Sequence, residues 1–202
     1  MKLDVKVAVA LGAASVLMAS QNGFAAEPLC DKSEIRLVNS MREIAQPYHG
    51  LVNAGGEGLA KWAGIAPDNY VLQLNQGDSD KQVSLMRSLL ATNAGCTVFN
   101  VEPDTDLVVQ SMVDTANESG AWIVTHWGHG GTSHPFDEAN SQWIAHVAVN
   151  SYDAGVLVSK ELMKALGGKG GIVALQGKLD VDPAQKRFAG LQAVLKENPD
   201  VK

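Results

Sequence analysis

The sequence predicts an α/β protein whose parallel sheets are covered by helices on both faces. Short apolar runs alternate with amphipathic helical segments from residue 34 to the end of the 202-residue chain. The apolar runs are nearly continuous, as expected for strands that are buried on both faces. With 46% hydrophobic and 19% charged residues, the composition is that of a globular protein with a sizeable core.

A secretory signal peptide is predicted over residues 1–26. Lys2 and Lys6 precede an apolar run at 7–18, and small residues suited to cleavage fall within 23–26. The apolar run is shorter than the roughly 20 residues that a membrane-spanning helix requires. The alternative, a buried N-terminal helix, lacks an amphipathic pattern beside the run.

The remaining elements follow in order along the chain. Apolar runs predict strands at 35–40, 70–74, 96–101, 122–125, 144–149 and 171–177. Helical spacing predicts helices at about 50–63, from 78 or 79 to 90, from 104 to 116, at about 152–166 and from 182 to about 196.

Three features justify the helix assignments. In the first helix, Leu51, Leu59 and Trp62 share one side. Asp78 or Ser79 can cap the second helix, and Asp104 can cap the third. The last helix starts with Asp182 and Pro183, a pair typical of an N-cap and a first turn.

Several function classes lack support. The net charge of −6 argues against nucleic-acid binding, which needs a clustered basic surface. No glycine-rich phosphate-binding motif and no nucleophile elbow occurs, so neither a nucleotide cofactor nor serine-dependent hydrolysis is predicted. We therefore expect no cofactor.

Polar and aromatic residues follow the first predicted strand. In "SMREIAQPYHG" they are Arg42, Gln46, Tyr48 and His49. Ligands of open parallel sheets bind beyond the carboxyl ends of the strands, so these residues belong to the expected binding edge. The rings suit stacking on a small ligand, while Arg42 and Gln46 offer polar contacts. For Tyr48, packing at the start of the helix is an equally good interpretation.

Three histidines follow the fourth predicted strand. His126, His129 and His134 lie with Asp137 in a glycine-rich segment. Three imidazoles and a carboxylate could form a zinc site, but their spacing matches none of the familiar helical zinc motifs. We therefore predict no metal. His146 lies within a predicted strand and is interpreted as a partly buried, hydrogen-bonded side chain.

The sequence resembles the type I periplasmic binding proteins, in the ribose- and galactose-binding branch that serves ABC transporters. The resemblance covers about residues 34–202. It is carried by the motifs "NSMREIAQPYH", "LNQGDSDKQVSLMRSLL", "VEPDTD", "WIVTHW", "HVAVNSYDAG", "ALGGKGGIVALQG" and "DPAQKRFAGLQAVLKENPDVK". It implies two α/β lobes of flavodoxin-like topology, one at 27–143 and an incomplete second one at 144–202.

The resemblance also implies roles for individual residues. Tyr48 and His49 fall where the family places aromatic rings that stack on the ligand. His126 and Trp127 replace an Asp-Arg pair of many sugar binders, which makes ribose itself doubtful. The remaining implied ligand contacts are a polar hinge residue, Asn150, and a hydroxyl-binding arginine, Arg187.

The resemblance implies a protein that is not an enzyme. The implied function is that of a monomeric periplasmic protein that delivers a sugar, polyol or sugar acid to an ABC transporter permease. Two alternatives stay open: a partner that presents its ligand to a chemoreceptor or histidine kinase, and a histidine-dependent metallohydrolase. Because the second lobe is incomplete, we expect the 202-residue chain alone to bind sugar weakly or not at all.

Two cysteines, Cys30 and Cys96, remain after the predicted signal peptide. An even number in an exported protein allows one disulfide, and two separate buried thiols are the alternative. With the flavodoxin-like order that the resemblance implies, both cysteines lie at the edge opposite the ligand, where a bridge between them is feasible.

Overall fold

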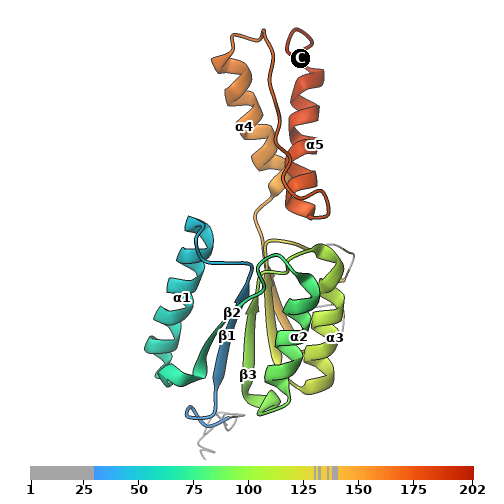
Figure 1. Cartoon of the computed structure of the whole chain (residues 1–202). Coiled ribbons are helices and arrows are strands. Elements are labelled where there is room, and N and C mark those ends of the chain that lie inside the picture. Colours follow the sequence, from blue (N-terminus) through green and yellow to red (C-terminus); the bar gives the residue numbers. More distant parts are fainter. Residues whose placement is uncertain (1–29, 130, 132, 136, 138–140) are drawn as a thin grey trace, which may run out of the picture.

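A computed structural model describes residues 30–202 of this protein, except for residues 130, 132, 136 and 138–140. The predicted signal peptide, at 1–26, lies outside the described residues. A sheet with its helices forms one lobe, and a pair of helices forms a second part beyond the strand ends (Figure 1). Within the described part of the chain, no helix is both long and apolar enough to cross a membrane.

Five parallel strands form the sheet in the order β2-β1-β3-β4-β5. This confirms the predicted fold class. The chain moves to one side of β1 for β2 and to the other side for β3, so the strand order reverses between β1 and β3, where ligands of such sheets bind. The bounds are β1 (Arg36–Met41), β2 (Tyr70–Leu74), β3 (Thr97–Val101), β4 (Trp122–His126) and β5 (Trp143–Val147).

Helices cover both faces of the sheet (Figure 1). On one face lies α1 (Pro47–Ala63), and on the other lie α2 (Ser79–Leu90) and α3 (Val109–Ser119). Asp78 caps α2 by accepting a hydrogen bond from the backbone N–H of Lys81. The main core lies between the sheet and α2 and α3, with Phe99, Met86, Met112 and Ile123 fully buried. Short 3₁₀ turns are Pro67–Asn69, Ala94–Cys96 and Asp106–Val108.

The face of the sheet under α1 is polar, and the apolar side of α1 does not pack on it. Leu51, Leu59 and Trp62 point outward, and Trp62 is 85% exposed. The sheet presents Asn39, which accepts a hydrogen bond from the Asn100 amide and donates one to the Tyr70 hydroxyl. A helix that packs on such groups does so with small and polar side chains, and the leucine side of α1 is left in solvent.

The fifth strand changes the expected division into lobes. The boundary at 143/144 falls within β5, which pairs in parallel with β4 in the same sheet. The first lobe therefore extends through Val147, and the chain leaves the sheet after that residue. A run such as "IAHVAV" identifies a strand by its composition, but the sheet it joins depends on partners far away in sequence.

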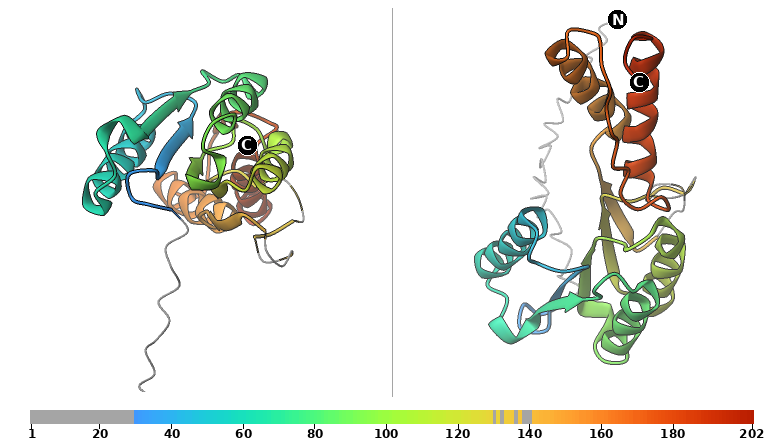
Figure 2. Two further views of the ribbon diagram at one scale, coloured as in Figure 1. Left: turned by 90° about the horizontal axis from the view of Figure 1, so that it is seen from below. Right: turned by 45° about the horizontal axis from the view of Figure 1, so that its top comes forward.

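The second part of the chain consists of α4 (Ser151–Ala165) and α5 (Asp182–Lys196), packed side by side (Figures 1 and 2). The strand expected at 171–177 does not form among the described residues. Only its start pairs, through a parallel bridge between Gly170 and Val201. Val173 and Leu175 are 90% and 95% exposed, because no neighbouring strand offers backbone groups to this segment.

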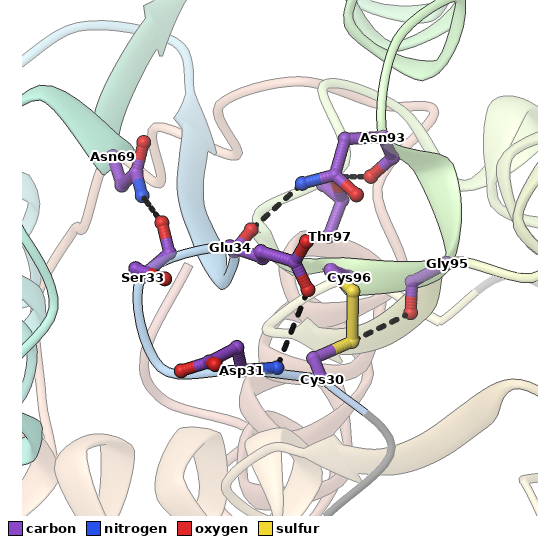
Figure 3. The surroundings of a disulfide bond; sticks show 9 residues. All are labelled: Cys30, Asp31, Ser33, Glu34, Asn69, Asn93, Gly95, Cys96 and Thr97. Atoms are coloured by element: carbon purple, nitrogen blue, oxygen red, sulfur yellow. Dashed lines mark hydrogen bonds between the residues drawn. A yellow bond between two sulfur atoms is a disulfide. The ribbon is translucent and has the colours of Figure 1, made fainter.

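A disulfide joins Cys30 to Cys96 across 66 residues of sequence (Figure 3). It ties the segment before β1 to the start of β3, at the edge of the sheet where the strands begin. Two hydrogen bonds support the same region: the Asn93 amide donates to the Glu34 carbonyl, and the Asn69 amide donates to the Ser33 carbonyl. The beginning of β1 is thus held in place from both neighbouring strands.

Candidate functional site

A cleft of about 200 Å³ lies where the carboxyl ends of the strands meet the start of α5. Figures 1 and 2 show this end of α5 beside the upper edge of the sheet. Both parts of the chain contribute to its lining. From the first lobe come Arg42, Gln46, His49, Glu102, Pro103, Asp104 and Trp127, and from the second come Gln176, Gly177, Lys178, Val181, Ala184 and Arg187.

Asp104 joins the two lobes through ion pairs. Its carboxylate lies 2.5 Å from the Arg42 guanidinium and 2.9 Å from the Lys178 ammonium, and its side chain is only 1% exposed. Burial opposes ionisation of Asp104. The hydrogen bond from Lys178 and the charge of Arg42 outweigh burial and hold the pKa of this carboxyl below its usual value. Asp104 therefore carries a negative charge at neutral pH and bridges a cation from each lobe.

This role replaces the helix cap that we expected for Asp104. The helical segment begins later, with a 3₁₀ turn at Asp106–Val108 that leads into α3. The buried Gln82 side chain accepts a hydrogen bond from the Asp104 backbone N–H at 2.9 Å, which fixes the turn after β3. The carboxylate is thereby directed into the cleft instead of toward the helix.

His49 lies between two carboxylates at the cleft wall. Its Nδ1 is 3.1 Å from Glu43 Oε1, and its Nε2 is 2.9 Å from Glu102 Oε2. Burial raises the pKa of Glu102, although the nearby His49 and Arg42 oppose the rise. His49 is itself buried and lines the cleft. Its contact with Glu102 orients that carboxylate.

An aromatic wall faces this polar side. Trp127 follows β4 directly and has a left-handed backbone, with φ of 73°, which is uncommon for a residue other than glycine. The Tyr48 ring lies 5.2 Å from the Trp127 ring, and the Arg187 guanidinium carbon lies 5.3 Å from it. The strained turn therefore presents the indole face both to the cleft and to a cation of the second lobe.

Three of the predicted site residues do not line the cleft. Tyr48 and His126 lie behind Trp127, where the Tyr48 hydroxyl and His126 Nδ1 form a hydrogen bond of 3.1 Å. Asn150 caps α4 and accepts a hydrogen bond from the Asp153 backbone N–H. It lies in the connection between the lobes, as expected of a hinge position. Arg42, Gln46, His49, Trp127 and Arg187 do line the cleft.

The other histidines form a separate cluster next to β5. The His129 ring is stacked on those of His134 and Trp143, with centroids 5.1 and 5.5 Å apart, and lies 4.7 Å from His146. Trp143 is buried and donates a hydrogen bond to Thr125, and it does not line the cleft. The described residues contain no group of three or more side chains arranged to hold a metal.

Sequence reasoning missed four polar or charged lining residues: Glu102, Asp104, Gln176 and Lys178. A usable signal existed for the first two, because they directly follow a predicted strand on the binding edge. Gln176 and Lys178 lie at the end of the strand predicted at 171–177, so the same rule applied to them. That strand does not form, and Lys178 instead reaches the cleft through its contact with Asp104 of the other lobe.

Acidification is expected to destabilise the protein through His126. Burial, together with the charges of His146 and His49, lowers the pKa of His126 to about 4. The unfolded chain takes up this proton near its ordinary pKa of about 6.5, so stability is complete above that pH and is lost progressively between about 6.5 and 4. We expect His126 to lower the free energy of unfolding in urea by about 2 kcal/mol from pH 7 to pH 5.

The control for this effect is His126→Gln, whose amide can still bond to Tyr48. The variant should lose the change of about 2 kcal/mol that is due to His126. It should keep the change due to the less buried His146, whose pKa is likewise lowered to about 4 by burial and by His129. An unchanged pH dependence in the variant would contradict the assignment to His126.

Residues 38–202 match a protein family described as a periplasmic binding protein domain. Among solved structures, the chain is similar to a twin-arginine translocation pathway signal protein from Burkholderia phytofirmans, at 34% identity and a TM-score of 0.78, over 83% of this chain and 51% of that one. No curated protein matches the chain.

Two more distant structures share the fold. One is the periplasmic binding protein component of the arabinose ABC transporter from Shewanella sp. ANA-3, bound to L-arabinofuranose (18% identity, TM-score 0.68, 83% of this chain and 52% of that one). The other is an ABC transporter solute binding protein from Bacillus halodurans with bound myo-inositol (20% identity, TM-score 0.67, 85% and 56%). The chain thus spans about half the length of the solved structures that it matches.

Proposed function

This chain belongs to the periplasmic binding protein family, and from this premise we propose that it binds a small carbohydrate or related polyol in the periplasm and delivers it to an ABC importer. The family consists of substrate-binding proteins and is not a family of enzymes. Solved structures of the same fold hold arabinofuranose and myo-inositol, which are small, hydroxyl-rich rings. We infer the binding role and the transporter partner from membership of this family.

The observation that carries the proposal is a cleft built from both lobes, with an indole face on one side and charged hydrogen-bonding groups on the other. Trp127 offers an apolar face for the C–H side of a sugar ring. Arg42, Glu102 and Asp104 offer donors and acceptors for hydroxyl groups. One apolar wall and a few convergent polar groups are typical of a site for a small polar molecule.

The contacts between the lobes suggest how binding is linked to closure. Lys178 forms an ion pair with Asp104, and Arg187 lies over the Trp127 ring. Each of these two contacts has one residue in each lobe. A ligand that touches side chains of both lobes stabilises this closed arrangement over an open one by its differential affinity. A permease that recognises the closed form would then bind the protein together with its ligand.

Replacing Trp127 tests the proposed site. The chain without residues 1–26 is titrated calorimetrically with pentoses, hexoses and polyols up to about 10 mM, which detects binding worth only about 4 kcal/mol. We expect weak binding of at least one of them, and Trp127→Ala should weaken it about tenfold through loss of the stacking face.

Trp62→Ala is the matched control, because Trp62 is 85% exposed on α1 and does not line the cleft. This variant should bind as the unmodified chain does. Failure of every carbohydrate and polyol to bind would refute the proposed function, and equal losses in both variants would refute the placement of the site.

A further inference from the structure

The cleft differs in charge from the rest of the protein. Its described lining contains three cations, Arg42, Lys178 and Arg187, and two carboxylates, Glu102 and Asp104, which gives a net charge of +1 at neutral pH. The whole chain carries −6. A positive cleft in an acidic protein attracts anions and favours them over neutral molecules.

The two carboxylates of the cleft already have partners. Asp104 is shared by Arg42 and Lys178, so two cations stand against one buried anion. Glu102 lies against His49 at 2.9 Å. Neither carboxylate is therefore free to neutralise a third cation.

Arg187 is that third cation. Among the residues that the structure describes, its guanidinium makes no hydrogen bond and no ion pair, and it lies over the Trp127 ring in a cation–π contact. An indole face attracts the cation but leaves the N–H donors at the edge of the guanidinium unused. These donors form a planar fork that matches a carboxylate or a phosphate in two parallel hydrogen bonds.

We propose that the cleft selects a carbohydrate that bears an anionic group, a carboxylate or a phosphate, and that Arg187 binds this group. This inference rests on the proposed function, since it takes the ligand to be a small carbohydrate. The sugar ring stacks on Trp127, and its anionic group meets Arg187 beside the same indole. The excess positive charge of the Arg42–Asp104–Lys178 group adds to the attraction.

Matched ligands separate charge from sugar recognition. The chain without residues 1–26 is titrated with D-galactose, D-galacturonate and galactose phosphate, and with D-ribose, D-ribonate and ribose phosphate. We expect one anionic member to bind at least about tenfold more tightly than its neutral parent, as a charge-assisted hydrogen-bond pair contributes. Comparing the affinities for the sugar acids and the sugar phosphates shows whether the site binds a carboxylate or a phosphate. Added salt should reduce the preference.

Variants test the assignment to Arg187. Arg187→Gln should remove the preference, lowering affinity for the anionic sugar about 10-fold to 100-fold while leaving that for the neutral parent unchanged. Arg187→Lys should keep part of the preference, since it retains the charge and loses the fork. Lys186→Gln is the control: it removes the same charge from the neighbouring residue, which pairs with Asp182 and does not line the cleft.

The outcomes separate the two proposals. Neutral sugars that bind as well as their anionic relatives would overturn the inference and leave the proposed function standing. A preference that survives Arg187→Gln would overturn the role of Arg187. Failure of all six compounds and of the polyols would refute the proposed function, and the inference with it.

Discussion

Replacing Cys30 and Cys96 by serine together is expected to lower the free energy of unfolding by about 4 kcal/mol. The disulfide closes a segment with a sequence separation of 66 residues, and chain-entropy arithmetic for a loop of that length gives this value. The bridge restricts the unfolded chain, while in the folded protein it holds the segment before β1 against the start of β3. The measurement is urea unfolding of the oxidised protein and the double variant.

A reducing agent provides the internal control. It should lower the stability of the unmodified protein to that of the double variant and leave the double variant unchanged. Because the bridge lies at the edge opposite the cleft, carbohydrate affinity below the unfolding transition should not change. Equal stability of the two proteins under oxidising conditions would contradict the prediction.

The second large effect is expected where α4 and α5 cross at two glycines. A Cβ atom added at Gly155 would overlap the backbone carbonyl of Arg187, and one added at Gly190 would lie 2.5 Å from the carbonyl oxygen of Tyr152. Both obstacles are backbone atoms, which cannot move aside as a flexible side chain can. We expect Gly155→Ala to destabilise the packing of α4 on α5 by about 3 kcal/mol, the upper part of the range for overpacked sites.

Hydrogen exchange of the α4 and α5 amides is the appropriate measurement, because the helix pair can open without the sheet. Gly58→Ala in α1 is the control, since a Cβ atom there meets nothing within 4 Å. That substitution should stabilise α1 by up to about 1 kcal/mol through helix propensity. Unchanged protection of α4 and α5 in Gly155→Ala would refute the close approach of the helices.

The crossing also bears on the cleft. Gly155 packs against the backbone of Arg187, so the distance between α4 and α5 sets the position of this arginine relative to Trp127. Gly155→Ala should therefore weaken binding of an anionic sugar as well as the helix packing. The selectivity for anionic sugars would then depend on a contact between two helices that does not itself involve the ligand.

Much of the first lobe could be predicted because its signals are local. Apolar runs mark β1 to β4 to within a residue or two, and Asp78 caps α2 as expected. The rule that ligands bind at the carboxyl ends of parallel strands placed Arg42, Gln46, His49 and Trp127 on one edge before any geometry was known. These inferences need only the order of residues along the chain.

Other features depended on contacts between residues far apart in sequence. The helical spacing of Leu51, Leu59 and Trp62 showed that they share a side, but that side faces solvent because Asn39 and Tyr70 make the sheet polar there. The run at 171–177 is apolar enough for a strand, yet no neighbouring strand pairs with it. The local pattern of apolar residues shows which side of a segment can be buried, but it does not specify the surface against which that side packs.

By itself, then, the sequence determined the α/β class, the positions of the five strands of the sheet, the edge on which the cleft lies and the two cysteines available for a bridge. Tertiary structure alone decided that β5 completes the first sheet and that Asp104 joins Arg42 and Lys178, which lie 62 and 74 residues from it in sequence. It also decided that Arg187 faces Trp127 with no carboxylate partner among the described residues. The physical reason is that strand pairing and ion pairing are set by distance in space. The charge that selects a ligand therefore appears only when the lobes are brought together.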